Sequence, residues 1–465
     1  MSEPGPIAPE KERGLARELG AWDVAAITAG TILGSALFIA AAFVPRAVPQ
    51  PTVVLVLWVV GGLLSIAGAL TYAELGTMFP EAGGQYHYLK QAFGPLWGFL
   101  FGWTALLVSQ SGSVAFLGVA FGEYLGAFAP FFSTKHLLAS VSIGGWTWAP
   151  NTVQAAGVAA IAALTAVNYF GVRQGARVQN LLTLIKVLSV VGLIVAGLTV
   201  RAKVSPDWTA PLPTVNLVAT MGLGLLAVLG VYDGWYQATM SGGEVRRPER
   251  NLPLGMIGGT VLIAVLYLLA NLVYLRALPI ADLATSPRIG ENAATALLGP
   301  GAGRLMAAAV LISTLGCLSS TILPASRLGL PMAQDGLFFR QLARIHPKYR
   351  TPGASIVVLG VWSSLLTLSG TYEQLFNYSI FSIFLFHTAT GIAVFALRRS
   401  QPNTPRPYRV WGYPWVPAIF ALSSLGLVVN TLAERPMESV LGVGLVALGV
   451  PVYFWMRRLH RAEQR

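Results

Sequence analysis

The sequence predicts an all-α integral membrane protein with twelve transmembrane helices, the first ten of which form two inverted repeats of five. Composition is the first observation: the 465-residue chain is 54% hydrophobic and 11% charged, whereas soluble domains carry about 25% charged residues. The second is a series of apolar stretches long enough to cross a bilayer as helices. The third is that residues unfavourable to helix interrupt the first and the sixth stretch.

The twelve stretches are joined by short connections, so we expect one integral domain with small tails. They lie at about residues 21–46, 52–79, 96–129, 151–171, 178–200, 216–244, 254–277, 304–330, 353–369, 373–397, 413–432 and 438–456. The expected organisation is an N-terminal tail at 1–20, a ten-helix core at 21–397, a linker at 398–412, helices 11 and 12 at 413–456, and a C-terminal tail at 457–465.

The distribution of Lys and Arg predicts that both termini are cytoplasmic. The net charge is +12, and most basic residues fall in the tails and in the loops that share a side with the N-terminus. Such loops face the cytoplasm by the positive-inside rule. Because the basicity is spread over many loops, it indicates topology and excludes a nucleic-acid partner. The first twenty residues show no signal peptide. We expect a multi-pass protein of the plasma (inner) membrane, embedded in the lipid bilayer.

The first stretch contains the sequence GTILGSALF at residues 30–38. Glycine permits irregular backbone, and the polar groups that a break frees in lipid need partners in the protein or in a wet cavity. A break at Gly34 would direct the N–H groups of Ser35, Ala36 and Leu37 toward one point. That end of a half-helix is positive and suits a carboxylate. The alternative is a small-residue face that only allows tight helix packing.

The sixth stretch repeats this interruption at Asp233-Gly234, a pair that favours turns and is poor inside a helix. Interruptions at stretches 1 and 6 are expected when helices 1–5 and 6–10 are inverted repeats, whose half-helices meet at the bilayer midplane and build a binding site. Asp233 is then either a polar wall facing an ammonium or guanidinium group, or a helix-end cap bonded to nearby backbone.

Lys186 is a second charge inside the membrane, in stretch 5. It either extends to the inner interface or faces inward. An inward ammonium would lie beside carbonyls freed near Ala29 and Gly30, with Ser313 and Thr314 of stretch 8 as further partners, and would take the place of a bound cation. Such a lysine is either fixed in its charged form or able to carry a proton.

No phosphate loop, metal-ligand spacing or nucleophile–base motif occurs in the sequence, so we expect no enzyme activity, no cofactor and no metal. The one cysteine, Cys317, lies inside an apolar stretch and cannot form an intrachain disulfide. These residues favour binding and translocation without covalent chemistry. A channel is disfavoured because no ring of charges or filter sequence is visible.

Six motifs carry a resemblance to a known family. They are GTILGSALF at 30–38, GALTYAELGTMFPEAGGQYHYL at 68–89, VNYFGVRQGARVQNLLTLIKVL at 167–188, YDGW at 232–235 followed by RRPERNLP at 246–253, MAQDGLFF at 332–339 and RPYRVWGYPWVP at 406–417. By these motifs the chain resembles the L-type amino acid transporter branch of the amino acid–polyamine–organocation superfamily. The resemblance implies a LeuT-like 5+5 inverted repeat with broken helices 1 and 6, plus two further helices.

The resemblance also implies a substrate site. In that family, N–H groups at the helix 1 break bind the amino acid carboxylate, and carbonyls before this break and in helix 6 bind its ammonium. The substrate-binding residues expected here are Ile32, Gly34, Ser35, Ala36, Gly230, Val231, Tyr232, Asp233 and Trp235. Lys186 matches the helix 5 lysine of Na⁺-independent members. Two positions depart from the family: Ala36 replaces a glycine, and Gly230 replaces a bulky gate, so we expect a roomy pocket.

We therefore expect a Na⁺-independent transporter of L-amino acids that works by alternating access, as an exchanger or with protons. The alternatives are a carrier of polyamines or organic cations, which would need more carboxylates than Asp233, and a transporter-like receptor without flux. Animal members of the family pair with a glycoprotein through an extracellular cysteine. This chain has no cysteine outside the membrane, so we expect no disulfide-linked ancillary subunit.

Overall fold

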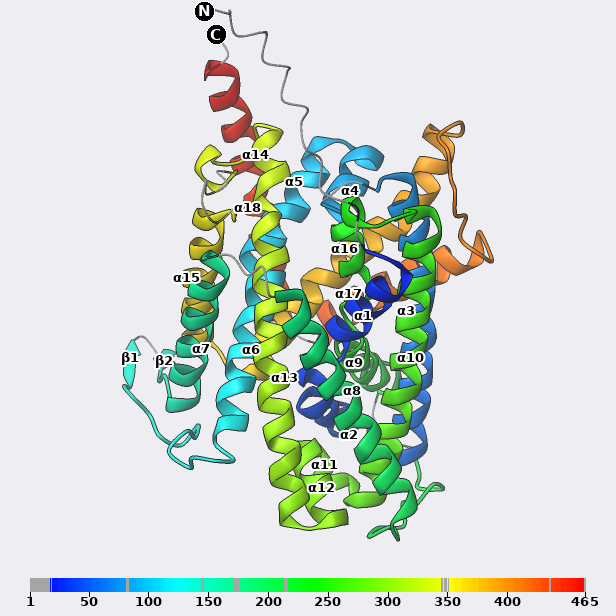
Figure 1. The fold of residues 1–465 in the computed structure, drawn as a ribbon, viewed down its shortest axis with the longest axis vertical. Coiled ribbons are helices and arrows are strands. Elements are labelled where there is room, and N and C mark those ends of the chain that lie inside the picture. The colour runs from blue at the N-terminus through cyan, green and yellow to red at the C-terminus, as the bar shows by residue number, and fades with distance from the viewer. Residues whose placement is uncertain are drawn as a thin grey trace, which may run out of the picture.

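A computed structural model gives the fold of the chain. It describes residues 17, 19–80, 83–143, 146–170, 175–212, 216–343, 346, 349, 351–434 and 436–463. The expected N-terminal tail at 1–20 lies outside the described residues except for residues 17, 19 and 20. Helices occur at all twelve predicted stretches, which confirms the fold class (Figure 1).

Helices 1–5 form the first repeat, and helix 1 is broken into short pieces. The elements are α1 (Ala21–Ile32), η1 (Ser35–Phe38), η2 (Ala40–Ala42) and α2 (Phe43–Ala47) for helix 1, α3 (Pro51–Met78) for helix 2, α5 (Pro95–Thr104), η3 (Ala105–Ser109) and α6 (Gln110–Leu125) for helix 3, α7 (Thr152–Tyr169) for helix 4, and α8 (Gly175–Thr199) for helix 5. The segment η3 is one π-helical turn that continues α5 into α6.

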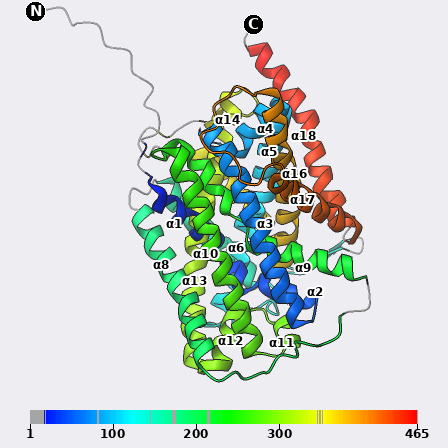
Figure 2. The same cartoon turned by 90° about the vertical axis from the view of Figure 1, so that its right-hand side faces the viewer.

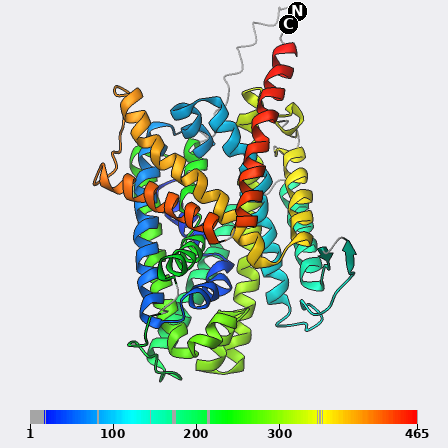
Figure 3. The same ribbon diagram turned by 180° about the vertical axis from the view of Figure 1, so that it is seen from behind.

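Helices 6–10 form the second repeat, and helix 6 is broken in turn. The elements are α9 (Leu217–Val231) and η4 (Trp235–Glu244) for helix 6, α10 (Pro248–Ala277) for helix 7, α13 (Pro300–Arg327) for helix 8, α15 (Gly353–Ser369) for helix 9 and α16 (Tyr372–Ser400) for helix 10. Figure 3 shows the two further helices, α17 (Trp415–Glu434) and α18 (Pro436–Glu463), on the outside of the bundle.

Local sequence sets several helix starts. Gln50 precedes α3 and its side chain accepts from the N–H of Val53 at 2.6 Å, while Pro51 occupies the first turn, where no donor is needed. Asn151 before α7 forms a capping box with Gln154. Among the described residues, eight segments are long and apolar enough to span a membrane, by length and composition.

Small elements mark the two ends of the bundle. The helices α4 (Gln85–Phe93) and α14 (Gly329–Gln334) lie at one end together with the end of α18, while α11 (Ile280–Thr285) and α12 (Ile289–Leu298) cover the other end (Figures 1 and 2). The loop after α6 carries an antiparallel hairpin of β1 (Val141–Ile143) and β2 (Trp146–Trp148), and the turn η5 (Arg340–Ala343) follows α14. The loops expected on opposite sides of the membrane therefore lie at opposite ends.

The linker after α16 is fixed to the bundle by a buried carboxylate. Glu74 of α3 is fully buried, and its oxygens accept from Arg398 at 2.9 and 2.7 Å and from the N–H of Val410 at 2.7 Å. At the same end, Lys90 of α4 pairs with Asp335 at 2.7 Å.

The outer surface of the bundle is apolar. Leu305, Leu63 and Val361 are 73%, 62% and 57% exposed, and exposed apolar area of this extent is expected where lipid is the solvent. Buried polar side chains also lie where the two broken helices meet.

Candidate functional site

The break in helix 1 lies at Leu33 and Gly34. The helix α1 ends at Ile32, Gly34 is extended with φ −101° and ψ −173°, and η1 begins at Ser35. The first N–H groups of a helix have no acceptor inside that helix. In η1 these are the N–H groups of Ser35 and Ala36. Both residues are buried. The predicted interruption of helix 1 is confirmed, and it leaves two buried donors at one place.

The break in helix 6 lies at Tyr232–Gly234 and touches the break in helix 1. Gly234 has φ +119°, a backbone conformation that favours glycine, and a Cβ built on it would lie 3.0 Å from the carbonyl carbon of Thr31. The hydroxyl of Thr31 donates to the Gly234 carbonyl at 3.0 Å. The two predicted breaks therefore meet, and glycine at 234 makes the close approach of the two backbones possible.

A cavity of about 60 Å³ lies at this meeting point. Its lining comprises Thr31, Ile32, Gly34, Ser35 and Ala36 of helix 1, Ser113, Phe116 and Leu117 of helix 3, Gly230, Val231, Asp233 and Gln237 of helix 6, Cys317, Ser320 and Thr321 of helix 8, and Ile380 of helix 10. Seven of the nine predicted substrate-binding residues lie in this set, and Tyr232 and Trp235 do not. The other residues in it were not predicted, because their place depends on helix packing.

The side chains of Tyr232 and Trp235 contact neighbouring helices and do not line this cavity. The hydroxyl of Tyr232 donates to the Trp58 carbonyl of α3 at 3.2 Å. Trp235 packs edge-on against Tyr72, with ring centroids 4.9 Å apart, and stacks on His387 at 5.2 Å. In a tight turn, successive side chains diverge, so Asp233 borders the cavity while the aromatic residues on either side pack against neighbouring helices.

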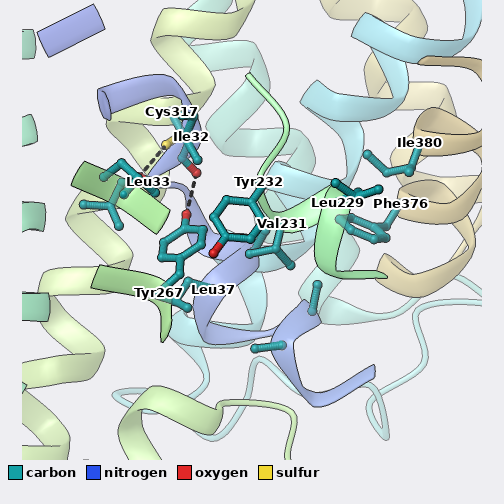
Figure 4. Close-up of a cluster of buried hydrophobic side chains, with 14 of the residues drawn as sticks. Ile32, Leu33, Leu37, Leu229, Val231, Tyr232, Tyr267, Cys317, Phe376 and Ile380 are labelled. Atoms are coloured by element: carbon teal, nitrogen blue, oxygen red, sulfur yellow. Dashed lines mark hydrogen bonds between the residues drawn. The ribbon is translucent and has the colours of Figure 1, made fainter. Parts of the chain in front are cut away.

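The Ile32 carbonyl is occupied, contrary to its predicted role as an acceptor for a substrate ammonium. It accepts from the N–H of Gly34 at 2.7 Å and from the hydroxyl of Tyr267 at 2.7 Å, and a carbonyl oxygen has two lone pairs. Figure 4 shows the Tyr267 hydroxyl directed at this carbonyl. Tyr267 of α10 therefore holds the break in helix 1, a role that no local pattern in the sequence signals.

Lys186 is buried and faces the interior, but its partner differs from the predicted ones. Its Nζ lies 2.9 Å from Sγ of Cys317, and this sulfur lies 3.9 Å from the Leu33 carbonyl. The carbonyl of Ala29 accepts instead from the N–H of Leu33 at 2.8 Å. Lys186 thus reaches the break in helix 1 through Cys317.

The hydroxyls expected beside Lys186 make other contacts. Thr314 donates to the Val310 carbonyl of its own helix at 2.8 Å, and the buried Ser313 hydroxyl has no hydrogen-bond partner among the described residues. Near Gly30, Thr183 of α8 approaches so closely that a Cβ on Gly30 would lie 2.8 Å from its hydroxyl oxygen. Gly30 therefore permits close packing of α1 on α8.

The space beside Gly230 is filled, so the expectation of a roomy pocket is wrong. A Cβ on Gly230 would lie 2.5 Å from Cζ of Phe376 and 2.9 Å from Cγ1 of Ile380. Both residues come from α16, and Figure 4 shows them beside Leu229 and Val231. An aromatic residue of helix 10 thus occupies the volume that a bulky residue of helix 6 would need.

Asp233 is the acidic residue in the lining. Its side chain is 14% exposed, and its Oδ1 atom is buried without a hydrogen-bond partner among the described residues. The nearest basic group is His387 of α16, whose Nε2 lies 3.7 Å from Oδ1. The site combines free backbone donors at one break with a carboxylate at the other.

Comparison with known proteins places this architecture in a family. A family profile described as amino acid permease matches residues 19–453. The serine/threonine exchanger SteT of Bacillus subtilis is 30% identical over 454 residues, covering 96% of this chain and 98% of the relative. The b(0,+)-type amino acid transporter 1 of Mus musculus is 31% identical over 462 residues, covering 97% and 92%. The large neutral amino acids transporter small subunit 2 of Homo sapiens is 29% identical over 452 residues, covering 95% and 80%.

Proposed function

Because the chain belongs to the amino acid permease family, we propose that it moves L-amino acids across the plasma membrane by alternating access, without sodium. That it is a membrane amino acid transporter and no enzyme follows from the family and its relatives. The observation that carries the mechanism is the meeting of two broken helices at one buried cavity. Transporters built from inverted repeats bind substrate at such a place.

The proposed carboxylate site is the start of η1. The N–H groups of Ser35 and Ala36 have no acceptor inside the helix, and the fully buried Ser35 hydroxyl has no hydrogen-bond partner among the described residues. Ser35 and Ala36 both line the cavity, and free N–H groups at the positive end of a helix suit an anion. Ala36 keeps its N–H, so the replacement of a glycine there removes no donor.

The proposed ammonium site is the C-terminal end of α9. The last carbonyls of a helix have no partner inside it and carry partial negative charge, and Val231 ends α9 and lines the cavity. The Val231 carbonyl replaces that of Ile32 in this role because Tyr267 already donates to Ile32. Asp233, two residues further, adds a full negative charge to the same wall.

Lys186 is proposed to stabilise the break in helix 1 in place of a cation. It is buried, it bonds Cys317, and Cys317 contacts both Gly34 and the Leu33 carbonyl. A fixed ammonium in this position makes a sodium ion unnecessary. If Lys186 stays charged through the cycle, transport is exchange or facilitated diffusion, and if it titrates, transport is coupled to protons.

The lining supports a substrate of small or medium size with a polar side chain. Six Ser, Thr and Gln residues from four helices line the cavity, namely Thr31, Ser35, Ser113, Gln237, Ser320 and Thr321. A serine/threonine exchanger is among the relatives, which supports the same size class. Asp233 permits a cationic side chain. A polyamine carrier is less well supported, because Asp233 is the only carboxylate among the described lining residues.

We propose cytoplasmic termini and function without a disulfide-linked subunit. The basic loops at the end of the bundle that holds α4 and α14 support this orientation. Cys317 is the one cysteine of the chain, is 4% exposed and lies between α8 and the break in helix 1, so another chain cannot reach it. The expected division into a ten-helix core at 21–397, a linker at 398–412 and helices 11 and 12 at 413–456 completes the proposal.

Uptake into proteoliposomes tests this function. Labelled serine, threonine, leucine and lysine are offered with and without internal amino acid, and with and without a pH gradient. Sodium-free uptake of at least one amino acid, accelerated by internal amino acid or by the gradient, is the expected result. Binding without flux under all these conditions would favour a receptor, and uptake of putrescine in preference to every amino acid would favour a polyamine carrier.

A further inference from the structure

A polar cluster lies behind Asp233, on the side of helix 6 that faces α16. His387 of α16 is 1% exposed. Its Nδ1 lies 2.6 Å from the hydroxyl of Tyr72 on α3, and its Nε2 lies 3.7 Å from Oδ1 of Asp233. The cluster therefore joins helix 2, the break in helix 6 and helix 10.

Two atoms of this cluster are buried and lack partners. Oδ1 of Asp233 and Nε2 of His387 each have no hydrogen bond among the described residues, although buried polar atoms are nearly always paired. They face each other, and 3.7 Å is slightly longer than a direct hydrogen bond. A small movement of either side chain would join them, and a proton on Nε2 would supply the donor.

Asp233 borders two cavities at once. One is the substrate cavity, and the second, of about 10 Å³, is lined by Asp233 together with Ser65 and Ser424, whose hydroxyls are also buried without partners in the described part of the chain. A space of this size accommodates about one water molecule. His387, which lines neither cavity, and the substrate cavity therefore both adjoin the Asp233 carboxylate.

Asp233 and His387 are the acidic and the basic side chain of this cluster. The titratable side chains that face His387 among the described residues are Asp233, Tyr72 of α3 and Tyr236 of η4, whose ring lies 5.0 Å from the imidazole. Tyrosines stay neutral near pH 7, whereas histidine changes charge there. The remaining neighbours are the rings of Trp235, Phe384 and Phe420.

We propose that His387 binds a proton that cancels the charge of Asp233, so that an amino acid with a cationic side chain binds when His387 is neutral. This rests on the proposed function, in which Asp233 lines the amino acid site. Protonated His387 pairs with Asp233 from behind, and a cationic side chain in the cavity competes for the same carboxylate. Binding of the cationic side chain releases the proton from Nε2 to water, and a neutral amino acid leaves it in place. His387 is thus a positioning residue that acts through Asp233.

Calorimetric titration of the full chain in lipid nanodiscs tests the proposal. The probes are ornithine and norleucine, which have side chains of equal length and differ in charge. Titration at pH 5.5, 6.5, 7.5 and 8.5 gives both affinities. Repetition in buffers of different ionisation enthalpy gives the number of protons released. His387→Gln, which keeps a polar side chain but cannot titrate, is the comparison variant.

The expected result is an ornithine-to-norleucine affinity ratio that rises by up to about tenfold per pH unit and then levels off. Up to one proton is released per ornithine at low pH, in excess of any released by norleucine. In His387→Gln the ratio is independent of pH. A flat ratio in the unmodified protein, or no excess proton release, overturns the proposal without requiring that the variant folds. A pH-dependent ratio in His387→Gln overturns it as well.

These outcomes separate this proposal from the proposed function. If norleucine binds and the ornithine-to-norleucine affinity ratio does not change with pH, the proposed amino acid site stands and the proposed role of His387 is wrong. Binding of neither amino acid, nor of serine or threonine, contradicts the proposed function itself and the role of His387 with it.

Discussion

The two breaks differ in how their freed polar groups are satisfied. At the break in helix 1, the Ile32 carbonyl is held by Tyr267, and a lysine stands behind it, joined through Cys317. At the break in helix 6, the carboxylate of Asp233 has one oxygen without a hydrogen-bond partner in the described structure and a histidine at 3.7 Å. Side chains from neighbouring helices thus hold the first break in place. At the second break, the carboxylate oxygen without a partner can still pair with a cation.

This difference separates two tasks. Every amino acid has the same carboxylate and ammonium, so the backbone groups that bind them can be held in one geometry. Side chains vary, and the wall that meets them must discriminate by size and charge. We infer that helix 1, together with the Val231 carbonyl at the end of α9, supplies the fixed part of the site, and that Asp233, with Phe376 and His387 of α16, supplies the selective part. Four substitutions test this division.

Gly34→Leu should have the largest effect, because Gly34 lies in the proposed carboxylate site, which every amino acid uses. A branched side chain at this position would fill the cavity of about 60 Å³ beside the donors of Ser35 and Ala36. We expect at least a ~100-fold loss of affinity for every amino acid, measured by calorimetry. Gly34→Ala is the matched control, since a Cβ at this position makes only ordinary contact with Cys317 at 3.7 Å. Unchanged affinity in a folded Gly34→Leu protein would refute the carboxylate site.

Lys186→Ala removes the ammonium behind the same break. A hydrogen bond that involves a charged group contributes about 1.5–3 kcal/mol, so we expect uptake to fall by about tenfold to a hundredfold for all substrates. Uptake is measured in sodium, potassium and choline media. Ser189→Ala is the control on the same helix and should transport normally, because the Ser189 hydroxyl donates to the Ile185 carbonyl one turn earlier. Strict sodium dependence of the unmodified protein, or full sodium-free activity of Lys186→Ala, would contradict the assigned role.

Asp233→Asn keeps the shape of the selective wall and removes its charge. A hydrogen bond to a charged group contributes about 1.5–3 kcal/mol, so we expect the ornithine-to-norleucine affinity ratio at pH 8.5 to fall by about tenfold or more. Norleucine measured on the same variant controls for folding. An equal loss for both amino acids would mean that Asp233 serves the common ammonium and not the side chain.

Phe376→Leu should have the smallest effect. It should alter the range of amino acids that the protein accepts and leave the rate of threonine uptake nearly unchanged. It frees room beside Gly230, so bulkier amino acids should compete about threefold to tenfold better against labelled threonine. Phe381→Leu is the matched control on α16, because that ring packs against Gly442 of α18 and not against the cavity. An unchanged competition profile would show that Phe376 does not limit substrate size.

Much of the fold could be predicted from the sequence because its signals are local. Apolar stretches of sufficient length predict spans, and Gly34 and the pair Asp233-Gly234 predict breaks, since helix propensity belongs to the residues themselves. The burial of Lys186 does not follow from its position in the sequence, because a lysine in a membrane helix either extends to the interface or faces inward, depending on how its helix packs.

Composition and local residue patterns suffice to predict a membrane transporter with two broken helices, one of which ends in a carboxylate. They do not predict what each broken end touches, which depends on helix packing: Tyr267 on Ile32, Cys317 on Lys186, Phe376 in the space beside Gly230, and His387 behind Asp233. Backbone preferences are set by neighbouring residues, but these contacts join residues more than a hundred positions apart. Which side chains meet there depends on how whole helices pack, and the direction of each side chain at a turn depends on the non-helical backbone.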